Sequence, residues 1–342
     1  MKPTAVAFST TFWALLCLSG CSLANDGDVA LAEHGPLDTV AQSLVRSNES
    51  QINGSQINGT QINGLRFNGV HTNGLRFNGV ELVGTAFHGV RESDGSQASL
   101  FDFEGVDVAA VLVDGEERDV RIEHIQETET PGLYFYEVLY DDNGTFRNIC
   151  SDNQYAIPMY GTWDEGGNPV GDSAQFTFAC RGAALAKCAE WGYQRWGVVE
   201  ECDGGECMHH SLMLFHQACT RLVRADYCGD GTPHTENGTL IDVWDAVGIQ
   251  NETPDSGLPL EAEWGPDGAT CIRHTRWADS PTTNPHKDYI LAHCPDRWAG
   301  PDDTECGGDT SSFHSANGLS IPLGLRSLLR NGSQTNLRST EP

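Results

Sequence analysis

The pattern of apolar and polar residues predicts a chain that folds first into strands, then into two helices, and then into strands again. Alternating apolar runs joined by Asp-Gly or Asn-Gly predict hairpins, because these dipeptides favour the tight turns between antiparallel strands. The predicted strands cover residues 109–113, 118–122, 133–140, 145–146, 175–179 and 239–244, and 261–273 around a turn at 265–268.

Two helices are predicted in the middle of the chain, over residues 183–193 and 211–226. The second has an apolar face formed by residues three and four positions apart, which are Leu212, Phe215, Cys219, Leu222 and Val223. Strands before and after a short helical stretch predict an α+β, β-rich domain.

Residues 51–90 repeat with a strict period of five, reading QINGS, QINGT, QINGL, RFNGV, HTNGL, RFNGV, ELVGT and AFHGV. Glycine occupies the fourth position of every unit, and a large apolar residue or threonine lies two positions before it. A period of five matches neither a helix nor simple strand alternation. It is typical of a solenoid in which one large and one small residue of each unit point inward.

This segment resembles the pentapeptide-repeat family, a right-handed quadrilateral β-helix with four pentads in each coil. The resemblance implies inward-facing central residues and glycines at the corners, where a positive φ costs little. The usual Asp or Asn before the central residue is absent here, and eight pentads make only two coils. A short pentapeptide-type β-helical segment and a flexible repeat segment both stay open.

The N-terminus predicts export. Residues 1–20 combine Lys2 with an apolar run, as secretory signals do. The run ends in Leu-Ser-Gly-Cys at 18–21, which resembles the lipobox of bacterial lipoproteins. The resemblance implies that Cys21 becomes the lipid-bearing first residue of the mature chain, with Ser22 favouring the outer membrane. Residues 21–50 then form the lipidated N-terminus and tether.

Cysteine usage agrees with export. After Cys17 and Cys21 are set aside, an even number remains, and all of them lie beyond residue 149. An oxidising compartment would pair them into disulfides, although the sequence leaves the pairing open. They are Cys150, Cys180, Cys188, Cys202, Cys207, Cys219, Cys228, Cys271, Cys294 and Cys306.

The chain of 342 residues carries a formal net charge of −28. Residues 92–310 hold 41 acidic and 12 basic residues, a net charge of −29, and form the predicted cysteine-rich domain. This charge excludes a nucleic-acid partner, which would need clustered Lys and Arg. Residues 311–342 contain no cysteine and are rich in Ser, Asn and Gly, which predicts a flexible tail.

Residues 224–248 read RADYCGDGTPHTENGTLIDVWDAVG. This motif resembles the ADYC domain, a family of bacterial exported proteins named after the tetrad at 225–228. The likeness spans roughly residues 100–306, including EAEWGPDGATC at 261–271. The family has no established activity, so the resemblance implies membership of a family and no particular reaction.

Two interpretations of the tetrad stay open. In one it is a structural corner, with Cys228 in a disulfide, Tyr227 in the core, and Asp226 or Asp242 capping backbone donors. In the other Cys228 is a nucleophile that acts with His234 and one of these two carboxylates. No familiar hydrolase or zinc-protease motif accompanies it.

The sequence also offers candidate ligands for metal ions. Acidic turns with glycine would suit a structural Ca²⁺, and the candidates are Asp141, Asp142 and Asp230. None matches a calcium-binding EF-hand loop, and Asp-Gly turns also form for backbone reasons alone. Zinc would use thiolates and imidazoles at Cys207, His209, His210, His216 and Cys219, but export favours disulfides over thiolates.

Two functions follow from these patterns. The first is a non-enzymatic cell-envelope lipoprotein, held in the membrane by Cys21, whose domain binds or scaffolds an envelope protein or polysaccharide. It faces either the periplasm or the outside and needs no cofactor other than a structural Ca²⁺. The second is an exported hydrolase that uses Cys228, His234 and a carboxylate.

Overall fold

The structure is a computed structural model, and all of the residues it describes belong to a unit that runs from Gly35 to Pro342. The described residues are 42–47, 70–72, 75–111, 117–142, 144–150, 154–164, 166–170, 175–203, 206–245, 247–303, 306 and 327–338. The predicted signal sequence, Cys21 and the first pentads at 51–69 lie outside these residues.

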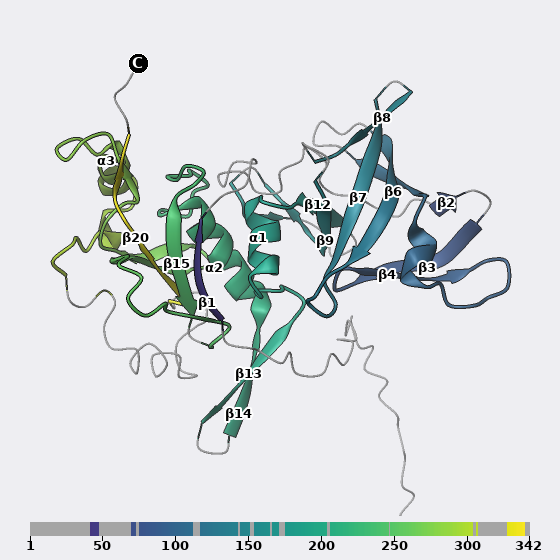
Figure 1. The fold of residues 1–342 in the computed structure, drawn as a ribbon, viewed down its shortest axis with the longest axis horizontal. Helices are drawn as coiled ribbons and strands as arrows, with labels where there is room; N and C mark the ends of the chain where they lie inside the picture. The colour runs from purple at the N-terminus through teal and green to yellow at the C-terminus, as the bar shows by residue number, and fades with distance from the viewer. Residues whose placement is uncertain are drawn as a thin grey trace, which may run out of the picture. The chain divides into compact units, whose positions relative to one another are not determined.

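The first large element is an antiparallel sheet of nine strands in the order β12-β9-β7-β6-β5-β2-β3-β4, with β8 paired to β7 (Figure 1). Its strands are β2 (Val70–Thr72), β3 (Leu75–Val83), β4 (Ala86–Arg91), β5 (Val106–Val111), β6 (Glu117–Glu127), β7 (Tyr134–Asp142), β8 (Thr145–Asn148), β9 (Ala156–Tyr160) and β12 (Phe176–Cys180). The predicted hairpins at 109–122 and 133–146 are confirmed as β5–β6 and β7–β8.

The nine-stranded sheet curls around an aromatic core. Phe87 on β4 lies 5.5 Å from Phe176 on β12 between ring centroids, although these strands stand at opposite ends of the strand order. The hydroxyl of Tyr136 also donates to the carbonyl of Thr85, in the turn between β3 and β4, at 2.5 Å. The two ends of the sheet therefore meet across one buried core.

A second sheet has six strands in the order β16-β1-β15-β20-β17-β18. They are β1 (Gln42–Ser47), β15 (Leu240–Asp245), β16 (Gln250–Asn251), β17 (Leu260–Gly265), β18 (Gly268–Ile272) and β20 (Leu329–Ser333). Helix α2 (Leu212–Arg224) packs against β17, β18 and β20 with the apolar face predicted for it, and all five of those residues are buried. Ser211 caps its first turn by accepting a hydrogen bond from the Met213 amide.

Helix α1 (Ala184–Glu190) connects the two sheets. One face contributes Ala184 and Cys188 to the core around α2, and Cys188 forms a disulfide with Cys219. The other face contributes Leu185 and Ala186 to a cluster with residues of the nine-stranded sheet. The smaller elements are η1 (Leu100–Phe103), β10 (Thr162–Trp163), β11 (Pro169–Val170), β13 (Val198–Asp203), β14 (Glu206–Ser211), β19 (Trp277–Ala278), α3 (Pro285–His293), η3 (Pro295–Arg297) and β21 (Asn336–Leu337).

The last pentads do not form a β-helix. Residues 75–91 fold into the antiparallel hairpin β3–β4, and its residues Phe77, Leu82 and Phe87 belong to the core of the nine-stranded sheet. The predicted pentapeptide-type repeat segment is not confirmed, and its last strands pack into the core that they share with strands of the cysteine-rich domain.

The predicted flexible tail is wrong for residues 327–338. Strand β20 lies beside β15 (Figure 1) and pairs with β17 on its other side in the six-stranded sheet. Leu329 is fully buried. The Asn331 side chain accepts from the Trp264 indole at 2.7 Å and donates to Glu261 at 2.6 Å. A strand with polar residues is stable there because Asn331 has buried partners and Arg330 donates to Glu263.

The β-rich fold with few helices is confirmed, and so is its stabilisation by disulfides. Four bridges are described, Cys150–Cys180, Cys188–Cys219, Cys228–Cys294 and Cys271–Cys306. The two remaining candidates, Cys202 and Cys207, occupy opposite register positions on β13 and β14. Over the part of the chain given above, no helix is long and apolar enough to span a membrane.

Candidate functional site

The tetrad at 225–228 forms a corner between the end of α2 and the second sheet, and we call residues 225–231 the tetrad corner. The helix ends at Arg224, two residues earlier than predicted, and Ala225 adopts the left-handed conformation with φ 51°. The Ala225 amide donates to the Leu222 carbonyl at 3.0 Å and the Asp226 amide to the Arg221 carbonyl at 2.9 Å. These bonds close the helix although its left-handed residue is an alanine, not a glycine.

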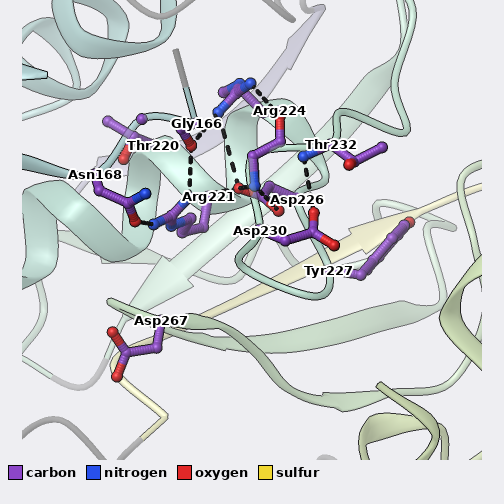
Figure 2. A network of polar contacts seen from close by, with 12 residues as sticks. Gly166, Asn168, Thr220, Arg221, Arg224, Asp226, Tyr227, Asp230, Thr232 and Asp267 are labelled. Atoms are coloured by element: carbon purple, nitrogen blue, oxygen red, sulfur yellow. Dashed lines mark hydrogen bonds and ion pairs between the residues drawn. The ribbon is translucent and has the colours of Figure 1, made fainter. Parts of the chain in front are cut away.

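Asp226 is fully buried beneath two arginines of α2. Arg221 contacts its carboxylate at 2.5 Å, Arg224 lies 3.8 Å away, and the Gly231 amide donates to both carboxylate oxygens (Figure 2). Burial raises the pKa of the Asp226 carboxyl, while the two guanidinium groups act in the opposite direction. The Asp226 carboxylate thus lies close to two buried arginines at the end of a helix.

The same arginines hold two neighbouring turns in place. Both Arg221 and Arg224 donate to the Gly166 carbonyl, at 2.8 and 2.9 Å (Figure 2). Arg221 also donates to the Asn168 side chain and to the Pro266 carbonyl. The backbone of Gly231 lies so close to Gly166 that a Cβ on Gly231 would approach the Gly166 Cα to 2.3 Å. The network therefore has a structural role, because the guanidinium N–H groups donate to oxygen atoms of the protein.

Tyr227 connects the corner to the second sheet. Its hydroxyl donates to Glu261 at 2.9 Å and accepts from the Arg276 amide at 3.1 Å, and its ring stacks on Trp264. Glu261 forms a buried ion pair with Arg276 at 2.9 Å. Burial raises the pKa of the Tyr227 phenol well above its ordinary value, so the group stays protonated.

The candidate catalytic residues are not brought together as a triad. Cys228 forms a disulfide with Cys294 after α3, so it offers no thiolate. Asp242 lies on β15 and accepts hydrogen bonds from the amide and hydroxyl of Thr253, at 3.0 and 2.9 Å. His234 Nδ1 faces His286 Nδ1 at 2.9 Å, so its hydrogen bond goes to another histidine and to neither carboxylate.

His234 belongs to a group of aromatic side chains between the tetrad corner and α3. Its ring lies 5.6 Å from that of Tyr227 and 4.9 Å from that of Tyr289. Burial, with His286 nearby, lowers the pKa of His234 to about 4, so the imidazole is neutral at pH 7. Tyr289 donates to Asp230 at 2.9 Å and connects α3 to the corner.

The predicted metal ligands have protein partners in the structure. Asp141 accepts from the Gly144 amide, Asp142 pairs with Arg147, and Asp230 accepts from Thr232 and Tyr289. Of the proposed zinc ligands, Cys219 is in a disulfide. His216 is buried with Nε2 3.1 Å from the Leu185 carbonyl. Among the described residues, no group of three or more His, Cys, Asp or Glu side chains is arranged to hold a metal ion.

Several residues of the site were not predicted from the sequence. Arg221 and Arg224 carried a signal, since two arginines next to the apolar face of a buried helix need buried acceptors. Glu261, Arg276 and His286 carried none, because only the fold brings them to the tetrad corner.

These features define a disulfide-bonded, β-rich domain, and such disulfides are typical of proteins outside the cytoplasm. The family model of the ADYC domain matches residues 100–278, more than half of the chain. The chain therefore belongs to the ADYC domain family. No curated protein and no solved structure matches it.

Proposed function

We propose that the chain is a lipid-anchored cell-envelope protein whose ADYC domain binds or scaffolds other envelope components without catalysing a reaction. The observation that carries this proposal is that three side chains of the tetrad are bonded to other residues of the domain. Asp226 is held by Arg221, Tyr227 by Glu261, and Cys228 by Cys294. The family's named motif thus serves the stability of the domain.

The Cys228–Cys294 disulfide also argues against the hydrolase, because a nucleophilic cysteine must be a thiolate. The polar partners of His234 and Asp242 give the same indication, since His234 is hydrogen-bonded to His286 and Asp242 to Thr253. A rigid, disulfide-bonded domain with net charge −29 over residues 92–310 is suited to display a surface to partners.

The remaining parts of the proposal rest on the sequence. The Leu-Ser-Gly-Cys motif supports a membrane anchor through a lipid on Cys21, and Ser22 supports the outer membrane. An envelope protein or polysaccharide is the proposed partner, on the periplasmic or the outer side. The acidic charge supports the exclusion of nucleic acid.

Thiol mapping of the folded protein tests the proposed role of the domain. We expect no alkylation of Cys228 before reduction, and a Cys228–Cys294 cross-linked peptide in the digest. Cys202 and Cys207 are expected as a fifth pair, because they stand opposite each other in the β13–β14 register. An alkylated Cys228 in the folded protein, with a hydrolytic activity that Cys228→Ser removes, would favour the enzyme instead.

Membrane fractionation tests the proposed anchor. We expect Cys21→Ala to release the protein from the membrane fraction, because the lipid on this residue supplies the attachment. Its disulfides should form as in the unaltered protein. If the variant stays with the membranes and the unaltered protein carries no acyl mass, the lipoprotein proposal is wrong.

A further inference from the structure

Arg195 differs from the other arginines whose side chains the structure describes. Each of the others donates a hydrogen bond or ion pair to an oxygen atom of the protein. They are Arg91, Arg121, Arg147, Arg181, Arg221, Arg224, Arg273, Arg276, Arg297, Arg330 and Arg338. Among the described residues the guanidinium of Arg195 has no such acceptor, and it lies against an aromatic ring.

The fold holds this guanidinium in a defined position. It lies over the ring of Trp163 on β10, 4.6 Å from the centroid, and Trp163 is itself 3 % exposed. Its Nη1 lies against Gly161, where a Cβ would come within 3.2 Å. Arg195 is partly exposed, so solvent reaches the group from one side. A guanidinium stacked in this way keeps its N–H donors in one plane.

Two other arginines stack on aromatic rings, and each also binds a carboxylate. Arg121 lies over Phe146 and pairs with Asp107 at 2.9 Å. Arg181 lies over Phe135 and pairs with Glu190 at 2.8 Å. Both have a ring against the face of the guanidinium and an acid at its edge. Arg195 has the ring without the acid.

Among the described residues, no carboxylate pairs with the charge of Arg195. Burial lowers its pKa to about 10, so it remains a cation at pH 7. The neighbouring His216 is neutral there, because burial and the Arg195 charge lower its pKa to about 3. A partly buried cation without a counter-ion is costly in free energy, and an anion that reached it would be stabilised.

We propose that Arg195, stacked on Trp163 beside Gly161, is a binding site for a carboxylate group of a ligand or partner. A carboxylate fits because it is planar and matches two parallel N–H groups of the guanidinium. It also brings a single negative charge to a chain of net charge −28, which repels a doubly charged phosphate more strongly. The proposal does not depend on the function proposed above.

Acetate is the probe that tests this site. Full-length protein labelled with ¹⁵N at arginine Nε is titrated with sodium acetate, and with sodium chloride at matched ionic strength. We expect acetate alone to give a saturable shift of one Nε–H signal, with a dissociation constant on the order of 10 mM. Arg195→Lys should remove that signal and Arg195→Gln should do the same, while Arg181→Lys, the stacked arginine with its own acid, should leave it.

Three results would overturn the proposal. One is the absence of a saturable shift in the unaltered protein, and another is an equal shift with chloride. The third is inorganic phosphate binding about tenfold more tightly than acetate, which would assign the site to phosphate groups. Because the titration of the unaltered protein decides the first two, a variant that fails to fold does not prevent the test.

Discussion

Asp226 and the two arginines above it show how much of the tetrad corner depends on one carboxylate. Arg221 and Arg224 carry two positive charges into the interior, where they are 2 % and 3 % exposed, and Asp226 supplies the nearest negative charge. Backbone carbonyls accept the other N–H groups. Removing the charge of Asp226 leaves both buried cations without the carboxylate that lies 2.5 Å from one and 3.8 Å from the other.

We therefore expect Asp226→Asn to lower the free energy of unfolding by about 3–5 kcal/mol, the usual cost of breaking a buried ion pair. Denaturant unfolding measures this loss. Asp230→Asn is the matched control, because Asp230 lies in the same corner but is exposed and bonded to Thr232 and Tyr289. Equal losses in the two variants would contradict this account of the network.

His216 predicts a pH dependence of stability. Burial first, and then Arg195, lower its pKa from 6.5 to about 3 in the folded chain. The unfolded chain binds a proton below pH 6.5 that the folded chain does not bind until about pH 3, so this residue makes stability fall as the pH falls through that window. We expect the free energy of unfolding, measured with urea, to fall less between pH 7 and about pH 4.5 in His216→Gln than in the unaltered protein. Identical losses would show that His216 does not titrate in this way.

At the scale of elements, a β-bulge explains how a sequence with a period of five can form a strand. Residues five apart in a regular strand face opposite sides of a sheet, yet Phe77 and Leu82 are both buried. The β3–β4 register shifts between Asn78 and Glu81, and Gly79 takes φ +60° at that point. The bulge restores the common face, so the described pentads place their large residues inward without forming a solenoid.

The C-terminal segment is the element whose removal should matter most. A chain ending at residue 326 lacks β20, which leaves β15 and β17 without their shared partner and Trp264 and Glu261 without Asn331. We expect this truncation to abolish the cooperative unfolding transition, measured by near-ultraviolet circular dichroism. A chain ending at residue 338 is the control and should keep the transition. A normal transition in the shorter chain would mean that β20 is dispensable.

At the scale of the molecule, the disulfides oppose a large internal repulsion. The 92–310 region carries a net charge of −29, and each described bridge joins segments at least 30 residues apart. Cross-links of this length stabilise a domain mainly by restricting its unfolded chain. Residues 92–310 alone lack β3, β4 and β20, so the full chain is the right material for the measurement.

We expect complete reduction to lower the midpoint of thermal unfolding by roughly ten degrees or more, because several bridges open together. Calorimetry with and without reductant measures the shift, and thiol counting verifies that the bridges have opened. Added salt should reduce the loss, since it screens the repulsion between acidic groups. An unchanged midpoint after verified reduction would mean that the cores are sufficient without the cross-links.

The sequence by itself determined the local elements of this protein. The β5–β6 and β7–β8 hairpins, the apolar face of α2 and the inward positions of Phe77, Leu82 and Phe87 were all readable from spacing. These features depend on neighbours within about ten residues, where periodicity and turn residues are informative. The even number of cysteines likewise indicated disulfides before any pairing was known.

The tertiary structure decided the partners. It assigned Cys228 to Cys294, placed β20 in the centre of a sheet, joined the described pentads to the domain, and set Arg195 on Trp163 without an acid among the described residues. Each of these facts joins residues far apart in the chain, and no local pattern encodes such distances. A polar segment such as 329–333 reads as a tail in sequence because its buried partners, Trp264 and Glu261, lie more than 60 residues away.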